Sequence, residues 1–536
     1  MKNLKADLVL LDGKIVTVDE DFSIKEAVAV REGSFLAVGV NKEIKPLIGS
    51  KTKVLDLKGK MVIPGLTDGH CHPISLGRVL EQLPLFGVYS ISRMTARLRK
   101  KVEATEPGRW IIGKAEAWEP ETLKEKRLPT KQDLDETALK NPVLISAYSS
   151  LGQISVVNSY TLKLAGIKKD TPDPNGGRIE RKTVTGEPTG VLYNTARELV
   201  WNKISQPFSE EEVKAAVKRA QRAFVEVGVT SVFDAHTDLQ EIKAYQSLAK
   251  RGELYLRVSL LPEWKVFTSC PDILTETRSE RLKIVGIKLM ADGGVMFRTA
   301  SMHEPYLGQP ENRGRLYMEP EELRRFVYEV HSQEKPVGIH CTGDHGQDIS
   351  VDAIVDALKR KPREDSRHSI IHGYFPTSNS LKKMRKHGIL YMAQPRFLHC
   401  WGESLLKIVG PERANRFKPL RTYIDSGVKV VGGSDAPVVD PNPFLGMHAA
   451  VTRKTVTGRV LGPEERVSIE EAIRMYTIDG AAATFEEDIK GSIEKGKLAD
   501  LAVLDKDLLT IPPDKVKNIK VVMTMIGGEI VYPRSA

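Results

Sequence analysis

The stretch Met61-Val-Ile-Pro-Gly-Leu-Thr-Asp-Gly-His-Cys-His-Pro73 runs from an apolar segment into two histidines separated by one residue. Its apolar residues predict a buried strand over 61–68. Because side chains alternate between faces in an extended chain, His70 and His72 point the same way and Cys71 points away. Two imidazoles on one face of a strand end can bind one metal ion, whereas a pair of exposed loop histidines is the competing interpretation.

Similar short apolar runs recur along the chain and alternate with long helical segments. The eight expected strands are 61–68, 229–234, 255–261, 285–290, 337–340, 369–372, 390–394 and 428–432. Strands that alternate with helices predict parallel β-α-β units. Eight parallel strands close into a barrel more naturally than they form an open sheet. The sequence therefore predicts an α/β protein with a (β/α)8 TIM barrel over residues 61–480.

Both ends of the chain have a different pattern, with short strands and tight turns. Asp12-Gly13 supplies the positive φ angles of a type I′ turn and predicts a hairpin. Further hairpins are expected around Glu32-Gly33 and Gly527-Gly528. Each end is too small to bury a core alone. We therefore expect one small β-sandwich that is assembled from residues 1–60 and 481–536.

The gap between the first two barrel strands is far too long for one helix. Residues 80–205 are therefore expected to form an insertion that includes a strand over 142–147. Insertions after a barrel strand sit over the active-site face. We interpret this region as a cap that covers the substrate.

Composition argues against several classes of function. The 80 Lys and Arg residues exceed the 70 Asp and Glu residues by ten, but acidic and basic residues are interleaved and no aromatic-rich basic motif is present. This pattern does not favour nucleic-acid binding. No apolar run approaches the length of a membrane span, and the N-terminal segment lacks the apolar core of a signal peptide. The four cysteines lack the spacing of a disulfide framework, so a cytoplasmic location is expected.

Other residue types that can bind metals occur in or just beyond the later strands. They are Lys288, His340, His372 and Asp435. The C-terminal ends of barrel strands are where such enzymes keep their catalytic groups. Taken singly, each residue has a structural explanation: a core histidine, a helix-capping aspartate or a surface lysine. Taken together with His70 and His72, they predict one metal centre.

Sequence motifs over almost the whole chain also indicate a metal-dependent enzyme. They span residues 65–72, 128–135, 157–159, 173–179, 186–191, 288–293, 298–306, 432–437 and 491–501. In these motifs the chain resembles the amidohydrolase superfamily and, within it, the YtcJ-like branch that includes N-substituted formamide deformylases. The resemblance implies a hydrolase that acts on the C–N bond of a small, non-peptide amide by metal-activated hydroxide.

The resemblance also implies a role for each ligand. Lys288 is expected to react with CO₂ and form a carbamate that bridges two metals, although an ion pair with Asp292 or another acid is the alternative. His70 and His72 are assigned to the deeper metal, and His340 and His372 to the outer one. Imidazole and carboxylate ligands favour Zn²⁺, with one or two ions per chain. Asp435 is expected to contact the deeper metal and to act as general base and then general acid.

Substrate contacts are expected from the cap and the strand ends. The candidates are Trp118, Gln153, Arg298 and Arg396. Two positions depart from the YtcJ-like pattern, which has a histidine at the position of Gln153 and an acid at the position of Ile371. Both positions are expected near the substrate.

Two other interpretations remain open at this point. The first is a deaminase or cyclic-amide hydrolase with a single metal, in which Lys288 carries no carbamate. The second is a catalytically silent binding or regulatory protein on the same fold. Besides the metal, the predicted binding partner is a small-molecule substrate of unspecified identity. Homodimers are common in the family, so a homodimer is also expected here.

Overall fold

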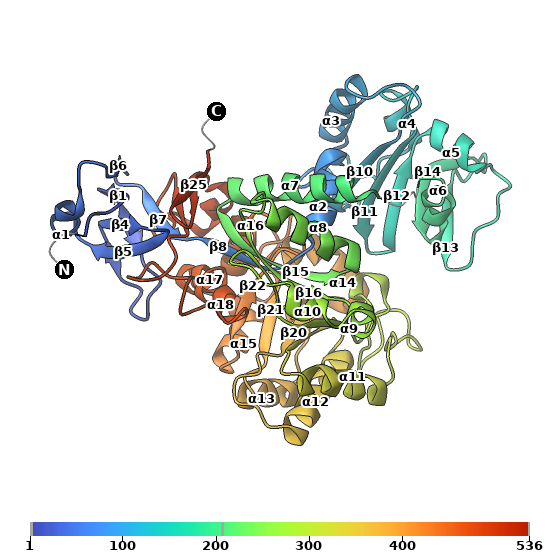
Figure 1. Ribbon diagram of the computed structural model, residues 1–536. Coiled ribbons are helices and arrows are strands. Elements are labelled where there is room, and N and C mark those ends of the chain that lie inside the picture. The colour runs from blue at the N-terminus through green and yellow to red at the C-terminus, as the bar shows by residue number, and fades with distance from the viewer. Residues whose placement is uncertain (1–3, 205–207, 534–536) are drawn as a thin grey trace.

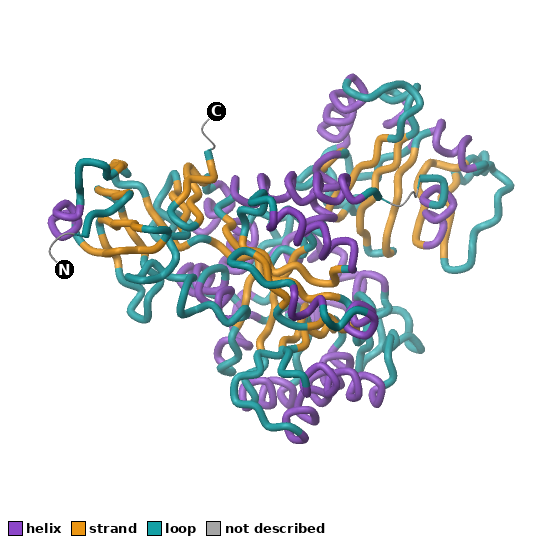
Figure 2. The backbone as a smooth tube through the Cα atoms, in the orientation of Figure 1, coloured by secondary structure: helices purple, strands orange, loops and turns teal. Residues whose placement is uncertain are grey.

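The computed structural model describes residues 4–204 and 208–533. It contains parallel strands surrounded by helices, two sheets near the chain ends and a separate sheet in the cap region (Figure 1). Figure 2 shows the helices packed around the outside of the parallel strands. Strands and helices thus alternate as expected for an α/β protein.

The parallel strands form two sheets, in the orders β17-β16-β15-β8 and β18-β19-β20-β21-β22. Their bounds are β8 (Leu66–Cys71), β15 (Val229–Thr237), β16 (Arg257–Pro262), β17 (Leu282–Ile284), β18 (Ile287–Met290), β19 (Val337–Cys341), β20 (Ser369–His372), β21 (Leu390–Ala393) and β22 (Val430–Gly432). The chain just beyond β22 returns to the end of β8, where the backbone N–H of Asp435 donates to the carbonyl oxygen of His70 at 2.6 Å. The last strand of one sheet therefore ends beside the first strand of the other.

One of the predicted strands is divided, and another begins later than predicted. The run over 61–68 forms β7 (Met61–Pro64), which belongs to a terminal sheet, and β8, which belongs to a parallel sheet. A Cβ atom on Gly65 would lie 2.3 Å from Oγ1 of Thr230, so only glycine fits where the chain crosses from one sheet to the other. The prediction of one continuous strand over 61–68 is therefore wrong. The run over 285–290 corresponds to β18, which begins two residues later than predicted, after Gly286, where a Cβ atom would lie 2.4 Å from a backbone oxygen.

The chain ends contribute two sheets, in the orders β25-β24-β23-β7-β2-β3 and β5-β4-β1-β6. Their other strands are β1 (Leu8–Leu11), β2 (Lys14–Val16), β3 (Ile24–Lys25), β4 (Ala27–Arg31), β5 (Ser34–Gly39), β6 (Lys53–Asp56), β23 (Leu501–Leu504), β24 (Val521–Ile526) and β25 (Glu529–Tyr532). One buried apolar cluster combines side chains of both sheets, among them Leu10, Val62 and Val503. Segments from opposite ends of the sequence therefore share a core.

The predicted hairpins have different outcomes. The turns at Glu32-Gly33 and Gly527-Gly528 join paired antiparallel strands, which confirms both. The hairpin at Asp12-Gly13 is wrong, because β4 and β6 already occupy both edges of β1. The Asp12-Gly13 turn instead carries the chain from one terminal sheet to the other.

The cap region contains a sheet in the order β13-β14-β12-β11-β10-β9, at the upper right of Figure 1. Its strands are β9 (Leu83–Pro84), β10 (Ile111–Ala117), β11 (Val143–Ser149), β12 (Gly152–Val157), β13 (Gly177–Arg181) and β14 (Pro188–Asn194). Helix α3 (Ile91–Glu103) covers it with Met94 and Leu98, which belong to a separate apolar cluster. The expected strand over 142–147 corresponds to β11.

The helices between the parallel strands begin where the sequence carries capping signals. Helix α7 (Glu210–Glu226) starts with a capping box formed by Ser209 and Glu212, and α17 (Ile469–Met475) starts with one formed by Ser468 and Glu471. The other main helices are α2 (Pro73–Glu81), α8 (Leu239–Lys250), α11 (Pro320–Ser332), α12 (Asp344–Arg360), α13 (Ser378–Lys386), α14 (Arg396–Asn415), α15 (Leu420–Asp425) and α16 (Pro443–Thr452). Across the described ranges, no helix is long and apolar enough to cross a membrane.

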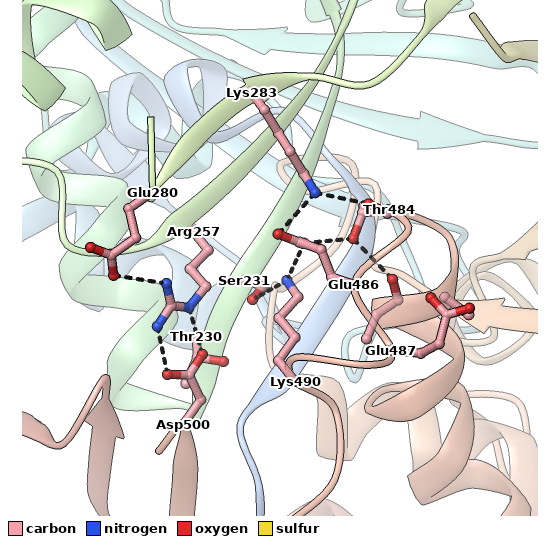
Figure 3. A network of polar contacts seen from close by, with 12 residues as sticks. Thr230, Ser231, Arg257, Glu280, Lys283, Thr484, Glu486, Glu487, Lys490 and Asp500 are labelled. Carbon is pink, nitrogen blue, oxygen red and sulfur yellow. Dashed lines mark hydrogen bonds and ion pairs between the residues drawn. The ribbon is translucent and has the colours of Figure 1, made fainter. Parts of the chain in front are cut away.

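A polar network joins the C-terminal segment to the starts of the parallel strands (Figure 3). Nε of Arg257 lies 2.7 Å from Oδ2 of Asp500, and both side chains are buried. Glu486 accepts hydrogen bonds from Lys490 and Lys283, at 2.9 and 2.8 Å. This network lies at the strand ends opposite those that carry His340 and His372.

Candidate metal centre

His70 and His72 extend from the end of β8 toward Asp435, which follows β22. Nε2 of His72 lies 3.0 Å from Oδ1 of Asp435, and Nε2 of His70 lies 3.6 Å from the same atom. Asp435 adopts a left-handed backbone with a φ of 59°, which turns its side chain back toward β8. The two histidines therefore share one side of the strand end, as the alternation of side chains predicts.

His340 and His372 lie beside this group, at the ends of β19 and β20. The ring centroids of His340 and His372 are 4.5 Å apart, and those of His70 and His372 are 5.2 Å apart. Ligand atoms of His70, His372 and Asp435 all lie within 4.8 Å of one another. A single metal ion can bridge donors over this span, and two imidazoles with a carboxylate suit a zinc-like divalent ion.

The protonation states of the imidazoles also fit a metal site. Burial, together with nearby Lys288, lowers the pKa of His340 to about 3 and lowers those of His70 and His372. These rings are therefore neutral at pH 7 and keep a lone pair for a ligand. Burial also opposes the charged form of His72, but its hydrogen bond with the Asp435 carboxylate raises its pKa overall.

Lys288 lies in β18 and is buried close to the imidazoles. Burial lowers its pKa to about 7, with Asp435 acting in the opposite direction. Asp292 accepts its hydrogen bonds from the backbone N–H groups of Ser301, Thr342 and Gly343. Among the described residues, Lys288 makes no ion pair with Asp292, and the choice between a carbamate and a pairing with another acid stays a prediction.

Hydrogen bonds define the tautomers of two ligand candidates. Nε2 of His340 lies 3.0 Å from the carbonyl oxygen of Gly293, and a carbonyl can only accept, so Nε2 carries the proton and Nδ1 is free. Nδ1 of His372 lies 2.9 Å from Oε1 of Gln394, whose amide nitrogen donates to the carbonyl of Met392. The Nε2 lone pair of His372 is therefore free.

The four predicted substrate-contact residues differ in their burial and in the partners that they bind. Trp118 is 1% exposed, and its indole N–H donates to the Val88 carbonyl inside the cap. Arg396, at the start of α14, makes a two-point ion pair with Glu116 of β10, with Nε to Oε1 at 2.9 Å and Nη2 to Oε2 at 3.1 Å. The roles of both residues in substrate contact stay predictions.

The other two candidates are partly exposed. Gln153 accepts a hydrogen bond from Arg197, and Nη1 of Arg298 donates to the carbonyl of Ser150 at 2.6 Å. The side chain of Ile371 is fully buried in an apolar cluster between the parallel strands, and its expected position near the substrate stays a prediction.

Sequence reasoning missed His236, near the end of β15. A pocket of about 170 Å³ beside the metal centre is lined by residues that include His72, Asp234 and His236. Burial, with Lys288 nearby, lowers the pKa of His236. His236 comes two residues after the predicted strand end at Asp234, so the rule that selected the other histidines could have found it.

Imidazoles and a carboxylate at the carboxyl ends of parallel strands define the kind of site that metal-dependent hydrolases use. A model of the amidohydrolase family matches residues 53–532, and the chain belongs to this family. The family assignment supports a hydrolase and a metal-binding site.

Individual relatives agree over nearly the full chain. The YtcJ protein of Bacillus subtilis (strain 168) is 29% identical, with 98% of this chain and 99% of the relative covered. The N-substituted formamide deformylase of Arthrobacter pascens is also 29% identical, with 99% of each chain covered. An uncharacterized metal-dependent hydrolase from Pyrococcus horikoshii OT3 has a TM-score of 0.72 at 25% identity, covering 94% of this chain and 99% of that chain. The resemblance to the YtcJ-like branch is thus confirmed.

Proposed function

We propose that this protein hydrolyses the C–N bond of a small, non-peptide amide in a metal-dependent reaction. The observation that carries the proposal is the convergence of His70, His372 and Asp435, whose ligand atoms lie within 4.8 Å of one another. The similarity to N-substituted formamide deformylase supports an amide-type substrate.

The proposed ligands come from both parallel sheets. They are His70, His72, Lys288, His340, His372 and Asp435. These residues would hold a divalent ion, which we propose to be zinc and which, when bound, would activate water and the substrate carbonyl as a Lewis acid. Lys288 contributes as a carbamate formed with CO₂, for which its burial and its pKa of about 7 are suited, since carboxylation needs the free amine.

Asp435 is the proposed proton carrier. Its Oδ1 atom lies 3.0 Å from Nε2 of His72, so the carboxylate is held beside the ligand cluster. A carboxylate at this position takes a proton from the attacking water and delivers it to the leaving nitrogen.

The family also supports a particular assembly of the sheets. We propose that the two parallel sheets close into one (β/α)8 barrel within residues 61–480, without β7, and that the insertion over 80–205 forms its cap. The two terminal sheets, which combine β7 with strands before residue 60 and after residue 481, form a composite β-sandwich. The hydrogen bond between Asp435 and His70 and the apolar cluster shared by the terminal sheets support this arrangement.

The test combines metal analysis with one substitution. Purified wild-type protein is expected to contain one or two zinc ions per chain and to hydrolyse members of a panel of N-acyl and cyclic amides. Asp435→Asn is expected to keep metal and to lose about 10²–10⁴-fold in kcat, whereas the surface variant Asp425→Asn keeps wild-type rates. A protein that binds no metal, or an Asp435→Asn variant with wild-type turnover, contradicts the proposal.

The carbamate is tested separately. Wild-type protein equilibrated with ¹³C-bicarbonate and zinc is expected to show a carbamate carbon resonance that Lys288→Arg lacks. If the wild type also lacks this resonance but hydrolyses amides, the single-metal mechanism with an unmodified lysine replaces the carbamate mechanism.

A further inference from the structure

One face of the cap sheet carries polar side chains in register across three strands. Lys114 of β10 pairs with Ser146 of β11, and Ser146 pairs with Ser155 of β12. Tyr148, two residues beyond Ser146, pairs with Gln153. Residues that pair across strands, or that lie two apart on one strand, share a face of the sheet. These five side chains therefore form one surface, which we call the cap face.

The cap face is directed toward the metal centre. Its strand β10 is joined to the start of α14 by the ion pair between Glu116 and Arg396. The ring of Tyr148 lies 5.7 Å from that of Trp401, which stacks on Phe397 at 3.9 Å. The Phe397 ring in turn lies 6.4 Å from the ring of His372. A continuous row of rings thus connects the cap face to a proposed metal ligand.

Two acidic groups beside the cap face already have cationic partners. Glu116 is paired with Arg396, and Glu119 is paired with Lys407 at 2.9 Å and accepts a hydrogen bond from Ser404. These carboxylates are therefore not available to neutralise other charges on the cap face.

Three cations at the cap face have no carboxylate partner within residues 4–204 and 208–533. Lys114 contacts the Tyr148 ring, with Nζ 4.3 Å from its centroid. Arg197 donates from Nε to Ser155 at 3.0 Å and from Nη1 to Gln153, both neutral acceptors. Arg298 donates to a backbone carbonyl, and its Nε is buried without a hydrogen-bond partner. The cap face therefore carries uncompensated positive charge.

Burial makes this charge unfavourable in the free protein. It lowers the pKa of Lys114 to about 7, and the nearby Arg197 guanidinium adds to the effect, while Asp435 opposes it. Burial likewise lowers the pKa of Arg197. A partly buried cation is stabilised when an anion forms hydrogen bonds to it. The complementary ligand therefore carries negative charge.

We propose that the substrate is an anionic amide whose carboxylate binds Lys114 and Arg197 on the cap face. This inference rests on the hydrolase function proposed above and names the substrate class. The partly exposed rings of Tyr148 and Phe297, whose centroids are 5.8 Å apart, contact an apolar group between the carboxylate and the scissile bond. Arg298 adds positive charge at the same edge of the cap face.

The first experiment compares matched amides that differ only in charge. N-formyl- and N-acetylphenylalanine, as both stereoisomers, are paired with their neutral C-terminal amides. Wild-type protein is expected to favour the anionic member by at least about tenfold in kcat/KM, and Lys114→Met and Arg197→Gln to remove most of this preference by raising KM. Lys114→Arg keeps the charge and the preference, and Lys163→Met, on the outside of the cap, behaves as wild type. A wild-type enzyme that prefers the neutral amides overturns the inference while leaving the hydrolase function intact.

A binding experiment separates the two proposals. The zinc-loaded protein is titrated calorimetrically with 3-phenylpropanoate and with 3-phenylpropanamide. We expect the anion to bind at least about tenfold more tightly and this difference to be lost in Lys114→Met and Arg197→Gln, whose folding is checked by circular dichroism. Equal affinities in the wild type, or an unchanged preference in both variants, overturn the inference. Retained binding preference without hydrolysis of any amide means that the hydrolase proposal fails and the anion site stands.

Discussion

Nζ of Lys418 lies 2.8 Å from Oε1 of Gln394. The same oxygen accepts from Nδ1 of His372 at 2.9 Å, so a buried lysine and a metal-ligand candidate share one acceptor. Lys418 is fully buried among the rings of Tyr374 and Phe397, at 4.4 and 5.1 Å from their centroids. Because Lys418 donates to the Gln394 side chain and the Gln394 amide nitrogen donates to the Met392 carbonyl, Gln394 is fixed in position and orients the His372 ring.

Gln394→Leu is expected to weaken zinc binding. The substitution removes the acceptor for Nδ1 of His372, and loss of such a partner of a ligating histidine typically costs about 10–100-fold in metal affinity. Gln394→Glu keeps an acceptor beside Lys418 and is the matched control. Competition with a chromophoric chelator measures the zinc affinity. Wild-type affinity in Gln394→Leu would show that the Gln394 contact does not orient the ligand.

Glu116→Gln is expected to loosen the cap. Its charge balances Arg396, which is buried, and removing one partner of a buried ion pair costs about 3–5 kcal/mol. Hydrogen exchange over residues 111–117 should therefore become faster, and kcat/KM should fall. The exposed cap variant Glu187→Gln is expected to exchange at wild-type rates. Unchanged exchange in Glu116→Gln argues that the ion pair does not hold the cap in place.

Asp500→Asn is expected to lower stability strongly. Asp500 and Arg257 are both 4% exposed and join the C-terminal segment to β16, so the variant leaves Arg257 buried with a weakened partner. A loss of about 3–5 kcal/mol is expected in urea unfolding. Glu321→Gln, which removes a surface pair with Arg324, should change stability by less than about 1 kcal/mol. Similar unfolding midpoints for both variants would refute the importance of the buried pair.

Glu486→Gln is expected to have a pH-dependent effect on stability. Burial disfavours the ionised form of Glu486 and so raises its pKa. The nearby Lys490 and Lys283 outweigh this effect and lower the pKa overall from 4.5 to about 2. Because this pKa is lower in the folded than in the unfolded state, the charged carboxylate contributes its full stabilisation at pH values above the unfolded-state pKa. This contribution is lost as the pH falls from about 5 toward 2.

The difference in the free energy of unfolding between wild type and Glu486→Gln should therefore be largest near neutral pH, at up to roughly 3 kcal/mol. This gap should disappear at acidic pH. Denaturant unfolding at a series of pH values measures this gap, with the exposed Glu529→Gln as control. A gap that is independent of pH would show that the Glu486 charge contributes nothing to stability.

Local patterns allowed much of the structure to be predicted from the sequence. The one-residue spacing of His70 and His72 fixes their common side, because strand side chains alternate. The capping box at Ser209 marks the start of α7, because it depends on residues only three apart. His340 and His372 could be selected because parallel strands bring their carboxyl ends to the same edge.

Features set by distant parts of the chain could not be predicted. The Asp12-Gly13 turn has hairpin chemistry, but competing strands occupy both edges of β1. Lys418 resembles a surface lysine in sequence, and only the packing of α14 and β21 buries it beside Gln394. Lys114 and Arg197 lie 83 positions apart, and only the cap sheet brings them to one face.

Strand β23 lies between β7 and β24, and β7 passes through Gly65 directly into the strand that carries His70. The partners of β7 thus come from residues 14–16 and from residues 501–504. During synthesis on the ribosome, the second partner emerges only after all the residues between β7 and residue 501 have been translated. The nascent protein consequently cannot complete the pairing of β7, and so secure the start of its first histidine-bearing strand, before that point.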